Sequence, residues 1–201
     1  MTSRRISVIS AALLLGAVAA VATAQAPAPA AAPTPTGYNI ELVVFSGNGG
    51  SSEDWSTPGA KAPVGGGDSG SGNAQIGRFL ATLPPSQFQL ANEVAKLRGS
   101  GRYQILTHIA WQQSASTWGT RAGFTLARLG SRAGGLSGLI YLERGTYLHL
   151  GVNIAYSAGG PTYRIDETRR IKFYDKQYFD HPAIGVLAMV TPSQGAKPPG
   201  R

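Results

Sequence analysis

The chain has 201 residues and no cysteine, and its 18 lysines and arginines outnumber its 10 aspartates and glutamates. The absence of cysteine excludes disulfides, thiol catalysis and thiolate metal ligands, so the folded part must be stabilised by its hydrophobic core alone. The formal charge of +8 favours anionic partners.

The N-terminus has the pattern of a secretory signal peptide, which we expect to comprise residues 1–24. Two arginines, Arg4 and Arg5, precede an apolar run, and residues 22–24 (Ala-Thr-Ala) form a small-x-small cleavage site. This pattern predicts export to the periplasm without a transmembrane anchor. Without the two arginines, 16 cations face 10 acids, a balance that suits peptidoglycan carboxylates, lipid headgroups or acidic proteins; nucleic acid lies in another compartment.

Composition divides the rest of the chain into a spacer, one domain and a tail. Residues 25–37 are rich in alanine and proline, which favours an extended spacer. Residues 38–192 are enough for one domain with its own core, and residues 193–201 are expected to be disordered. Within the domain, residues 46–76 are so rich in glycine and serine that we expect a mobile loop, in which Trp55 is the residue best suited to pin it.

The first half of the domain predicts a strand, a helix and a second strand. Residues 38–45 show strand alternation, and residues 84–98 combine an apolar stripe with prolines in the first turn, which is typical of a helix with Thr82 near its N-cap. Residues 101–113 return to strand alternation. One face of this strand is expected to hold Tyr103, Ile105, Thr107, Ile109 and Trp111.

The second half predicts further strands. Residues 136–156 indicate a hairpin around a turn at residues 143–146. Residues 162–174 alternate as in an edge strand, and the apolar residues 183–191 are typical of a central strand. Residues 114–134 fit a short strand or a helical turn, and we favour the strand. These elements predict an α+β fold: a single domain with a mainly antiparallel β-sheet and one amphipathic helix packed on one face.

Five stretches of the domain contain motifs that occur in a fixed order. In the last one, RRIKFYDKQYFDHPAIGVLAMVTP (169–192), an Arg-Arg strand leads through a polar turn into an aromatic-Asp-His-Pro motif and an apolar strand. The other four are YNIELVVF (38–45), SSEDW (51–55), LRGSGRYQILTHIAWQQ (97–113) and GTYLHLGVNIAY (145–156). Together these stretches resemble the CsiV family of periplasmic peptidoglycan-binding proteins. The resemblance implies a periplasmic, non-enzymatic protein that binds peptidoglycan and supports cell-wall assembly. It also implies that the protein helps an outer-membrane lipoprotein to activate a bifunctional penicillin-binding protein.

The adjacent Asp180 and His181 suggest a catalytic pair, but strand geometry disfavours that interpretation. Neighbouring side chains of an extended chain point to opposite sides, so these two do not easily share a hydrogen bond. No Gly-x-Ser-x-Gly motif supplies a nucleophile. We therefore interpret the stretch as a turn in which Asp180 accepts backbone N–H groups and Pro182 leads into the last strand.

Neither a metal site nor a hydrolytic site stands out among the titratable residues. His108, His149 and His181 are the only histidines and lack metal-binding spacing; three strands could still assemble a zinc site, but we expect no metal and no cofactor. A cell-wall hydrolase needs two carboxylates about 5–9.5 Å apart. The acids of the later strands are Glu143, Asp166, Glu167 and Asp180. None forms a dedicated pair, and Glu143 is expected in a turn, so a hydrolase that uses Glu143 or Asp180 is the alternative function.

Aromatic and cationic residues of the last strands favour binding. Sugar C–H groups pack on aromatic faces, and arginine binds carboxylates through its planar fork of N–H donors. The candidate ligand-binding residues are Tyr147, His149, Arg169, Arg170, Tyr174, Tyr178, Asp180 and His181. A third possible function is an envelope adaptor that binds another protein through its basic surface.

Overall fold

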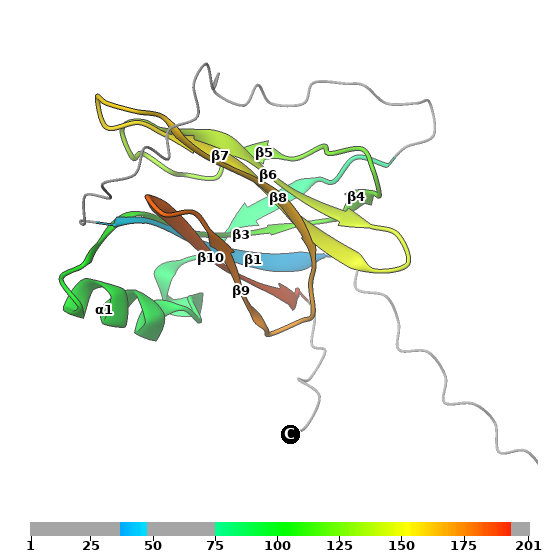
Figure 1. Ribbon diagram of the computed structural model, residues 1–201. Coiled ribbons are helices and arrows are strands. Elements are labelled where there is room, and N and C mark those ends of the chain that lie inside the picture. Colours follow the sequence, from blue (N-terminus) through cyan, green and yellow to red (C-terminus); the bar gives the residue numbers. More distant parts are fainter. Residues whose placement is uncertain (1–36, 48–74, 194–201) are drawn as a thin grey trace, which may run out of the picture. The chain divides into compact units, whose positions relative to one another are not determined.

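Ten strands in the described part of the chain, residues 37–47 and 75–193, form two five-stranded sheets in the computed structural model (Figure 1). The expected signal peptide, spacer and tail, and nearly all of the loop at 46–76 with Trp55, lie outside these residues. All the described residues belong to one compact unit, which spans residues 34–201.

The first sheet is antiparallel throughout and has the strand order β2-β3-β1-β10-β9. Its strands are β1 (Tyr38–Gly47), β2 (Phe79–Thr82), β3 (Tyr103–Gln113), β9 (Lys176–Asp180) and β10 (Ile184–Pro192). The first and last long strands of the domain, β1 and β10, pair along nearly their whole length at the centre of this sheet. The prediction of a central last strand is confirmed.

The second sheet has the strand order β4-β6-β7-β8, and β5 also pairs with β6. Its strands are β4 (Ser116–Thr117), β5 (Phe124–Thr125), β6 (Leu136–Arg144), β7 (Leu148–Tyr156) and β8 (Tyr163–Arg170). The expected hairpin is β6–β7, and β8 is an edge strand as predicted. In the segment 114–134 only β4 and β5 are strands, each two residues long.

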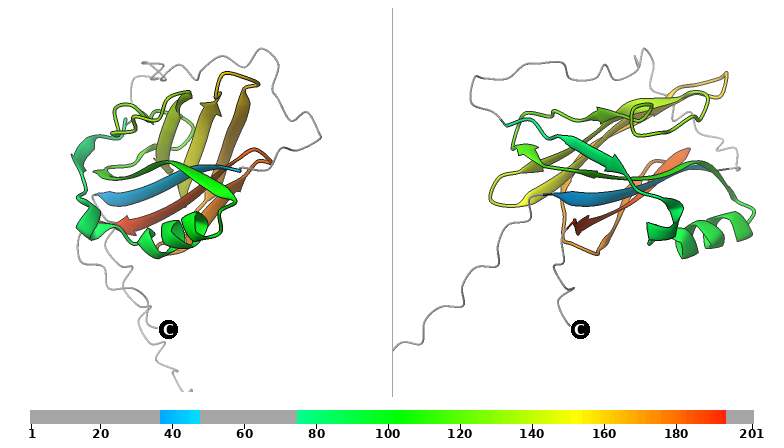
Figure 2. Two further views of the ribbon diagram at one scale, coloured as in Figure 1. Left: turned by 90° about the vertical axis from the view of Figure 1, so that its left-hand side faces the viewer. Right: turned by 180° about the vertical axis from the view of Figure 1, so that it is seen from behind.

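The two sheets pack face to face and enclose the larger core (Figure 2). Ile40, Leu42 and Val44 of β1 and Leu150 and Val152 of β7 are all fully buried in this cluster. Alternate positions on each strand supply these side chains, because successive residues of a strand point to opposite faces. Each fully buried aliphatic side chain stabilises the fold by about 1.5–3 kcal/mol.

The helix α1 (Ala91–Gly99), preceded by a 3₁₀ turn η1 (Pro85–Gln87), lies on the other face of the first sheet (Figure 2). The second core cluster lies between this helix segment and the sheet and consists of Val43, Phe45, Leu90, Val94 and Met189. Strand β1 is therefore buried on both faces. The predicted α+β class, with a mainly antiparallel strand content and one helix packed on a sheet face, is confirmed; the structure adds that the strands divide into two sheets.

The helix begins later than the sequence pattern predicts. Thr82 is the last residue of β2 rather than a cap, and the prolines after it form η1. Leu90 occupies the N-cap position, and its apolar side chain makes no hydrogen bond to the first turn of the helix. The pattern at 84–98 was misleading because prolines fit both a first helical turn and a short 3₁₀ turn.

The carboxylate of Glu41 on β1 satisfies the backbone at the start of α1. It accepts hydrogen bonds from the backbone N–H of Gln89 at 2.6 Å and of Leu90 at 3.0 Å. The His108 imidazole on β3 also donates from Nε2 to Glu41 Oε1 at 2.7 Å. The Glu41 side chain is buried on the helix side of the sheet, so one acid from the centre of the sheet orients both the helix and a neighbouring strand.

Strand β3 does not keep one face along its whole length. The register between β1 and β3 shifts after Val44, where Thr107 pairs with Val44 but Ile105 pairs with Phe45. This bulge inserts one extra residue and reverses the sides of the residues beyond it. Ile109 and Trp111 therefore lie in the core between the sheets, whereas Ile105 packs on the helix side. The predicted single face of five residues is wrong for this reason.

We predict that Glu41→Ala lowers the free energy of unfolding by about 2–3 kcal/mol, because it leaves buried backbone donors and the His108 ring without their acceptor. Urea denaturation of the full chain measures this change. The matched control is Asp175→Ala, which removes an exposed acid in the turn before β9. Equal unfolding midpoints for the two variants would contradict the proposed role of Glu41.

Candidate functional site

The structure divides the predicted ligand-binding residues between two surfaces. Tyr147, His149 and Arg170 meet at one end of the second sheet, whereas Tyr178 and Asp180 lie on the outer face of the first sheet. Arg169 is in β8, Tyr174 lies in the connection from β8 to β9, and His181 lies in the turn between β9 and β10. The eight residues therefore do not form one site.

The first surface, which we call the aromatic–cationic patch, consists of Trp118, Tyr147, His149 and Arg170. The Trp118 and His149 rings lie 4.1 Å apart between centroids, and the Arg170 guanidinium lies 3.4 Å from the centre of the Tyr147 ring. His149 and Arg170 are directly paired across β7 and β8. Trp118 is 52 % exposed and Tyr147 is 48 % exposed, so both aromatic rings are accessible to a ligand.

Strand pairing places Trp118 in the patch. Ser116 and Thr117 of β4 pair in parallel with the end of β6, and the Trp118 N–H donates to the Arg144 carbonyl at 3.1 Å. Gly145, in the β6–β7 turn, lies so close that a Cβ there would be 3.2 Å from the Trp118 Cβ. Trp118 was missed by the sequence analysis because residues 114–134 show no clear periodicity. Its exposure is the signal that identifies it.

Glu143 anchors the loop that carries Trp118. The sequence placed Glu143 in a turn, but it lies within β6 and is buried. Its Oε1 accepts hydrogen bonds from the Arg121 backbone N–H and from the Thr120 hydroxyl, the latter at 3.3 Å. The turn prediction is wrong because β6 extends through Arg144, and the carboxylate is used to hold this loop against the sheet.

Arg169 joins the edges of the two sheets. Its Nε donates to the Glu167 carboxylate at 2.7 Å, and its guanidinium donates to the backbone carbonyl of Tyr178 on β9. The same guanidinium lies 5.0 Å from the centre of the buried Phe179 ring. Arg169 thus faces inward between β8 and β9, whereas Arg170 faces outward to the patch.

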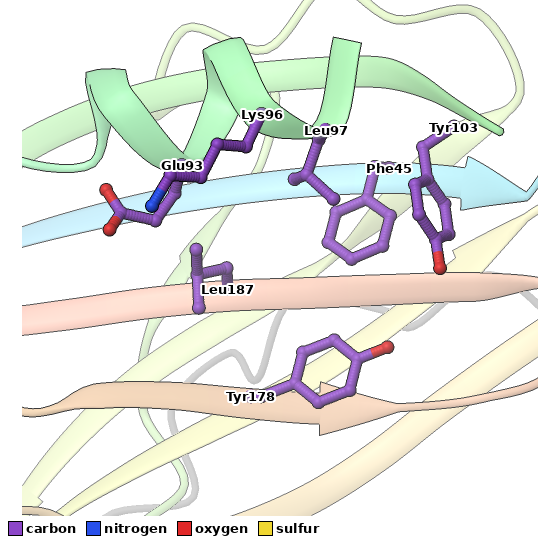
Figure 3. A pocket seen from close by; sticks show the side chains of 7 residues that line it. All are labelled: Phe45, Glu93, Lys96, Leu97, Tyr103, Tyr178 and Leu187. Carbon is purple, nitrogen blue, oxygen red and sulfur yellow. The ribbon is translucent and has the colours of Figure 1, made fainter. Parts of the chain in front are cut away.

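The second surface is a groove of about 320 Å³ between α1 and β9, above β10 (Figure 3). We call it the tyrosine groove. It is lined by Phe45, Glu93, Lys96, Leu97, Tyr103, Tyr178 and Leu187. Leu187 and Phe45 form its apolar floor, and the Tyr103 and Tyr178 rings stand at its sides.

The Asp180–His181 stretch is a hairpin turn between β9 and β10. Asp180 accepts a hydrogen bond from the Tyr178 hydroxyl at 2.9 Å, and His181 Nδ1 accepts one from the Ala183 N–H at 3.1 Å. The backbone N–H group is thus bound by the histidine rather than by the aspartate. Tyr174 lies in a different connection, between β8 and β9, where it adopts a positive φ of 65° and donates its N–H to the Val190 carbonyl at 3.0 Å.

With this geometry established, comparison with known proteins identifies the family. A family model described as "Peptidoglycan-binding protein, CsiV" matches residues 9–193. The chain belongs to the CsiV family. The resemblance of the five sequence stretches to this family is thereby confirmed. No curated protein and no solved structure gave a significant match.

The described residues of this CsiV-family chain contain neither a membrane-spanning helix nor a metal-binding cluster. In residues 37–47 and 75–193, no helix is both long and apolar enough to cross a membrane. Within the same ranges, histidine and acidic side chains form no cluster of three that could hold a metal ion.

We predict that Tyr178 titrates late. Burial raises the pKa of the Tyr178 hydroxyl to about 12, with smaller contributions from the hydrogen bond to Asp180 and the charge of Asp180. Asp180→Asn should lower this pKa only in part, because burial remains. Alkaline titration of the tyrosine ring signals by NMR measures it, and Tyr178→Phe assigns the signal.

The raised pKa also predicts how stability depends on pH. The unfolded Tyr178 ionises near its ordinary value of 10.0, while the folded state keeps its proton up to about 12. The contribution of Tyr178 is therefore complete below pH 10 and is lost as the pH rises from 10 to 12. A Tyr178 ring signal that titrates at 10 in the folded protein would contradict this account.

Proposed function

We propose that this protein binds peptidoglycan in the cell envelope and performs no chemistry on it. The observation that carries this proposal is the aromatic–cationic patch, in which two exposed aromatic rings flank a histidine and an arginine. Membership of a peptidoglycan-binding family supports the choice of ligand.

The patch offers the contacts that a peptidoglycan fragment needs. The exposed faces of Trp118 and Tyr147 suit the C–H groups of a sugar ring, because these rings provide a large apolar surface with a polar edge. The exposed Arg170, whose guanidinium lies 3.4 Å from the centre of the Tyr147 ring, offers N–H donors for a carboxylate of the lactyl group or the stem peptide. The patch therefore places contacts for a neutral sugar ring beside contacts for a carboxylate of the same ligand.

The positions of the acids support binding over hydrolysis. Glu143 is engaged by the Arg121 N–H and the Thr120 hydroxyl, and Asp180 lies on the other sheet, bonded to the Tyr178 hydroxyl. Two-carboxylate glycoside hydrolysis needs both acids on either side of one scissile bond. A hydrolase that uses Glu143 or Asp180 remains the alternative, which release of soluble muropeptides from the sacculus would favour.

The cellular setting belongs to the same proposal. The N-terminal pattern of residues 1–24 supports export to the periplasm, and the Ala/Pro-rich residues 25–37 would then separate the domain from the cleavage site. We also propose, from the family resemblance alone, that the protein helps an outer-membrane lipoprotein to activate a bifunctional penicillin-binding protein. Comparison of peptidoglycan synthesis with and without the purified chain tests that role.

We predict that the full mature chain co-sediments with purified insoluble peptidoglycan at low salt and less at high salt. Trp118→Ala and Arg170→Ala should each weaken binding about tenfold to thirtyfold, because truncating a central aromatic or arginine anchor costs about 2 kcal/mol. Circular dichroism of each variant checks its folding.

The matched control is Arg128→Ala. Arg128 also stacks on an aromatic ring, 5.1 Å from the centre of Phe124, but it lies outside the patch. We expect Arg128→Ala to bind as the unmodified chain does. Absence of co-sedimentation at low salt would overturn the binding proposal, and equal losses for Arg128→Ala and Arg170→Ala would overturn the site.

A further inference from the structure

We propose that the tyrosine groove is a docking site for an extended acidic segment of another protein, which inserts one aromatic or branched aliphatic side chain between Tyr103 and Tyr178. The groove lies on the outer face of the first sheet, and the aromatic–cationic patch lies on the outer face of the second sheet. The inference therefore concerns a separate surface and goes beyond peptidoglycan binding.

The groove is apolar, open and of a size that suits one side chain. Its two tyrosines are unusually exposed for their size, Tyr103 at 38 % and Tyr178 at 44 %. Its volume of about 320 Å³ lies at the lower limit of small-molecule pockets, which range from about 300 to 1,000 Å³. A single buried aromatic side chain removes about 150–250 Å² from water, which is enough to anchor a flexible segment.

Contacts within the protein fix the walls of the groove before a ligand arrives. The Phe45 ring lies parallel to the Tyr178 ring at 6.2 Å and meets the Tyr103 ring edge to face at 5.2 Å. Asp180 accepts a hydrogen bond from the Tyr178 hydroxyl, which restrains the orientation of that ring. Because little must be ordered on binding, more of the contact energy remains as affinity.

The charges around the groove favour an acidic occupant, because four cations, Lys96, Lys176, Arg98 and Arg102, face the two acids Glu93 and Asp180. Glu93 on α1 and Lys176 on β9 form an ion pair, which neutralises both. Lys96 lines the groove, and Arg98 and Arg102 follow it on the exposed end of the helix and the next loop. None of the ion pairs found in the described residues includes these three cations.

Two features indicate a peptide side chain rather than a sugar or an added strand. The groove walls offer few free polar groups for sugar hydroxyls, since the Tyr178 hydroxyl already donates to Asp180. The outer edge of β9 is partly covered, because Arg169 occupies the Tyr178 carbonyl. A partner segment therefore docks through its side chain and its charge, not by extending the sheet.

The test adds three synthetic peptides, one at a time, to the full mature chain. Binding is followed by the NMR shifts of the Tyr103, Tyr178 and Leu187 signals. The first probe is acetyl-Gly-Glu-Glu-Trp-Glu-Gly-amide; one control replaces its three glutamates by lysine and the other replaces tryptophan by alanine. We expect the acidic tryptophan peptide to bind at least about tenfold more tightly than either control, with contact shifts confined to the groove.

Variants locate the binding and separate it from the proposed function. Lys96→Glu should weaken the acidic peptide about threefold, as expected for one exposed ion pair, and Leu187→Glu should abolish binding. The matched control Arg132→Glu makes the same charge change on the exposed turn before β6 and should have no effect. Both groove variants should retain co-sedimentation with peptidoglycan, whereas Trp118→Ala and Arg170→Ala should retain peptide binding.

Three results would overturn the proposal. One is equal affinity for the acidic and the lysine peptides, and another is shifts that fall outside the groove. The third concerns the chain's own Glu53-Asp54-Trp55 sequence, which has the same chemistry as the probe. If Trp55→Ala shifts the Tyr103 and Tyr178 signals in the absence of peptide, the groove belongs to this chain rather than to a partner.

Discussion

Burial of β1 on both faces is the constraint on which the rest of the structure depends. One face of this strand packs against the second sheet through Ile40, Leu42 and Val44, and the other packs against α1 through Val43 and Phe45. A strand covered on both sides leaves only the two outermost surfaces for ligands. The exposed aromatic rings occur on these surfaces, in the patch on one side and in the groove on the other. We infer that the layer order itself separates two binding functions in one small domain.

The alternating pattern of the long strands predicted most of this fold, because each buries one regular face. β7 and β8 were placed correctly for that reason, and so was the fully apolar β10. The pattern failed where long-range contacts decide. The bulge after Val44 moves Ile105 to the helix side, and the start of α1 is set by Glu41, a residue 49 positions away from Leu90. The sequence of residues 84–98 alone gives no indication of this hydrogen bond, because its acceptor lies in β1.

The candidate site was less predictable than the fold. Tyr147, His149 and Arg170 were predicted as ligand-binding residues from their aromatic and cationic chemistry, and the structure does bring these three together. Trp118 joins them only through the short parallel pairing of β4 with β6, which leaves no periodic trace in the sequence. Arg169 looks equivalent to Arg170 in the sequence, but strand alternation turns it inward to hold β9. The sequence therefore indicated which residue types could bind the ligand, whereas the pairing of the strands determines which of those residues lie together.

The central claim is that peptidoglycan binds to the second sheet and not to the groove beside α1. Titration of the isotope-labelled full chain with a soluble disaccharide-tetrapeptide fragment of peptidoglycan, followed by NMR, tests this claim most directly. The account predicts shifts of the Trp118 indole N–H and of the amide signals of Tyr147 and Arg170, with the Leu187 amide unchanged. Shifts confined to the groove, or no shifts at a saturating concentration of the fragment, would contradict it.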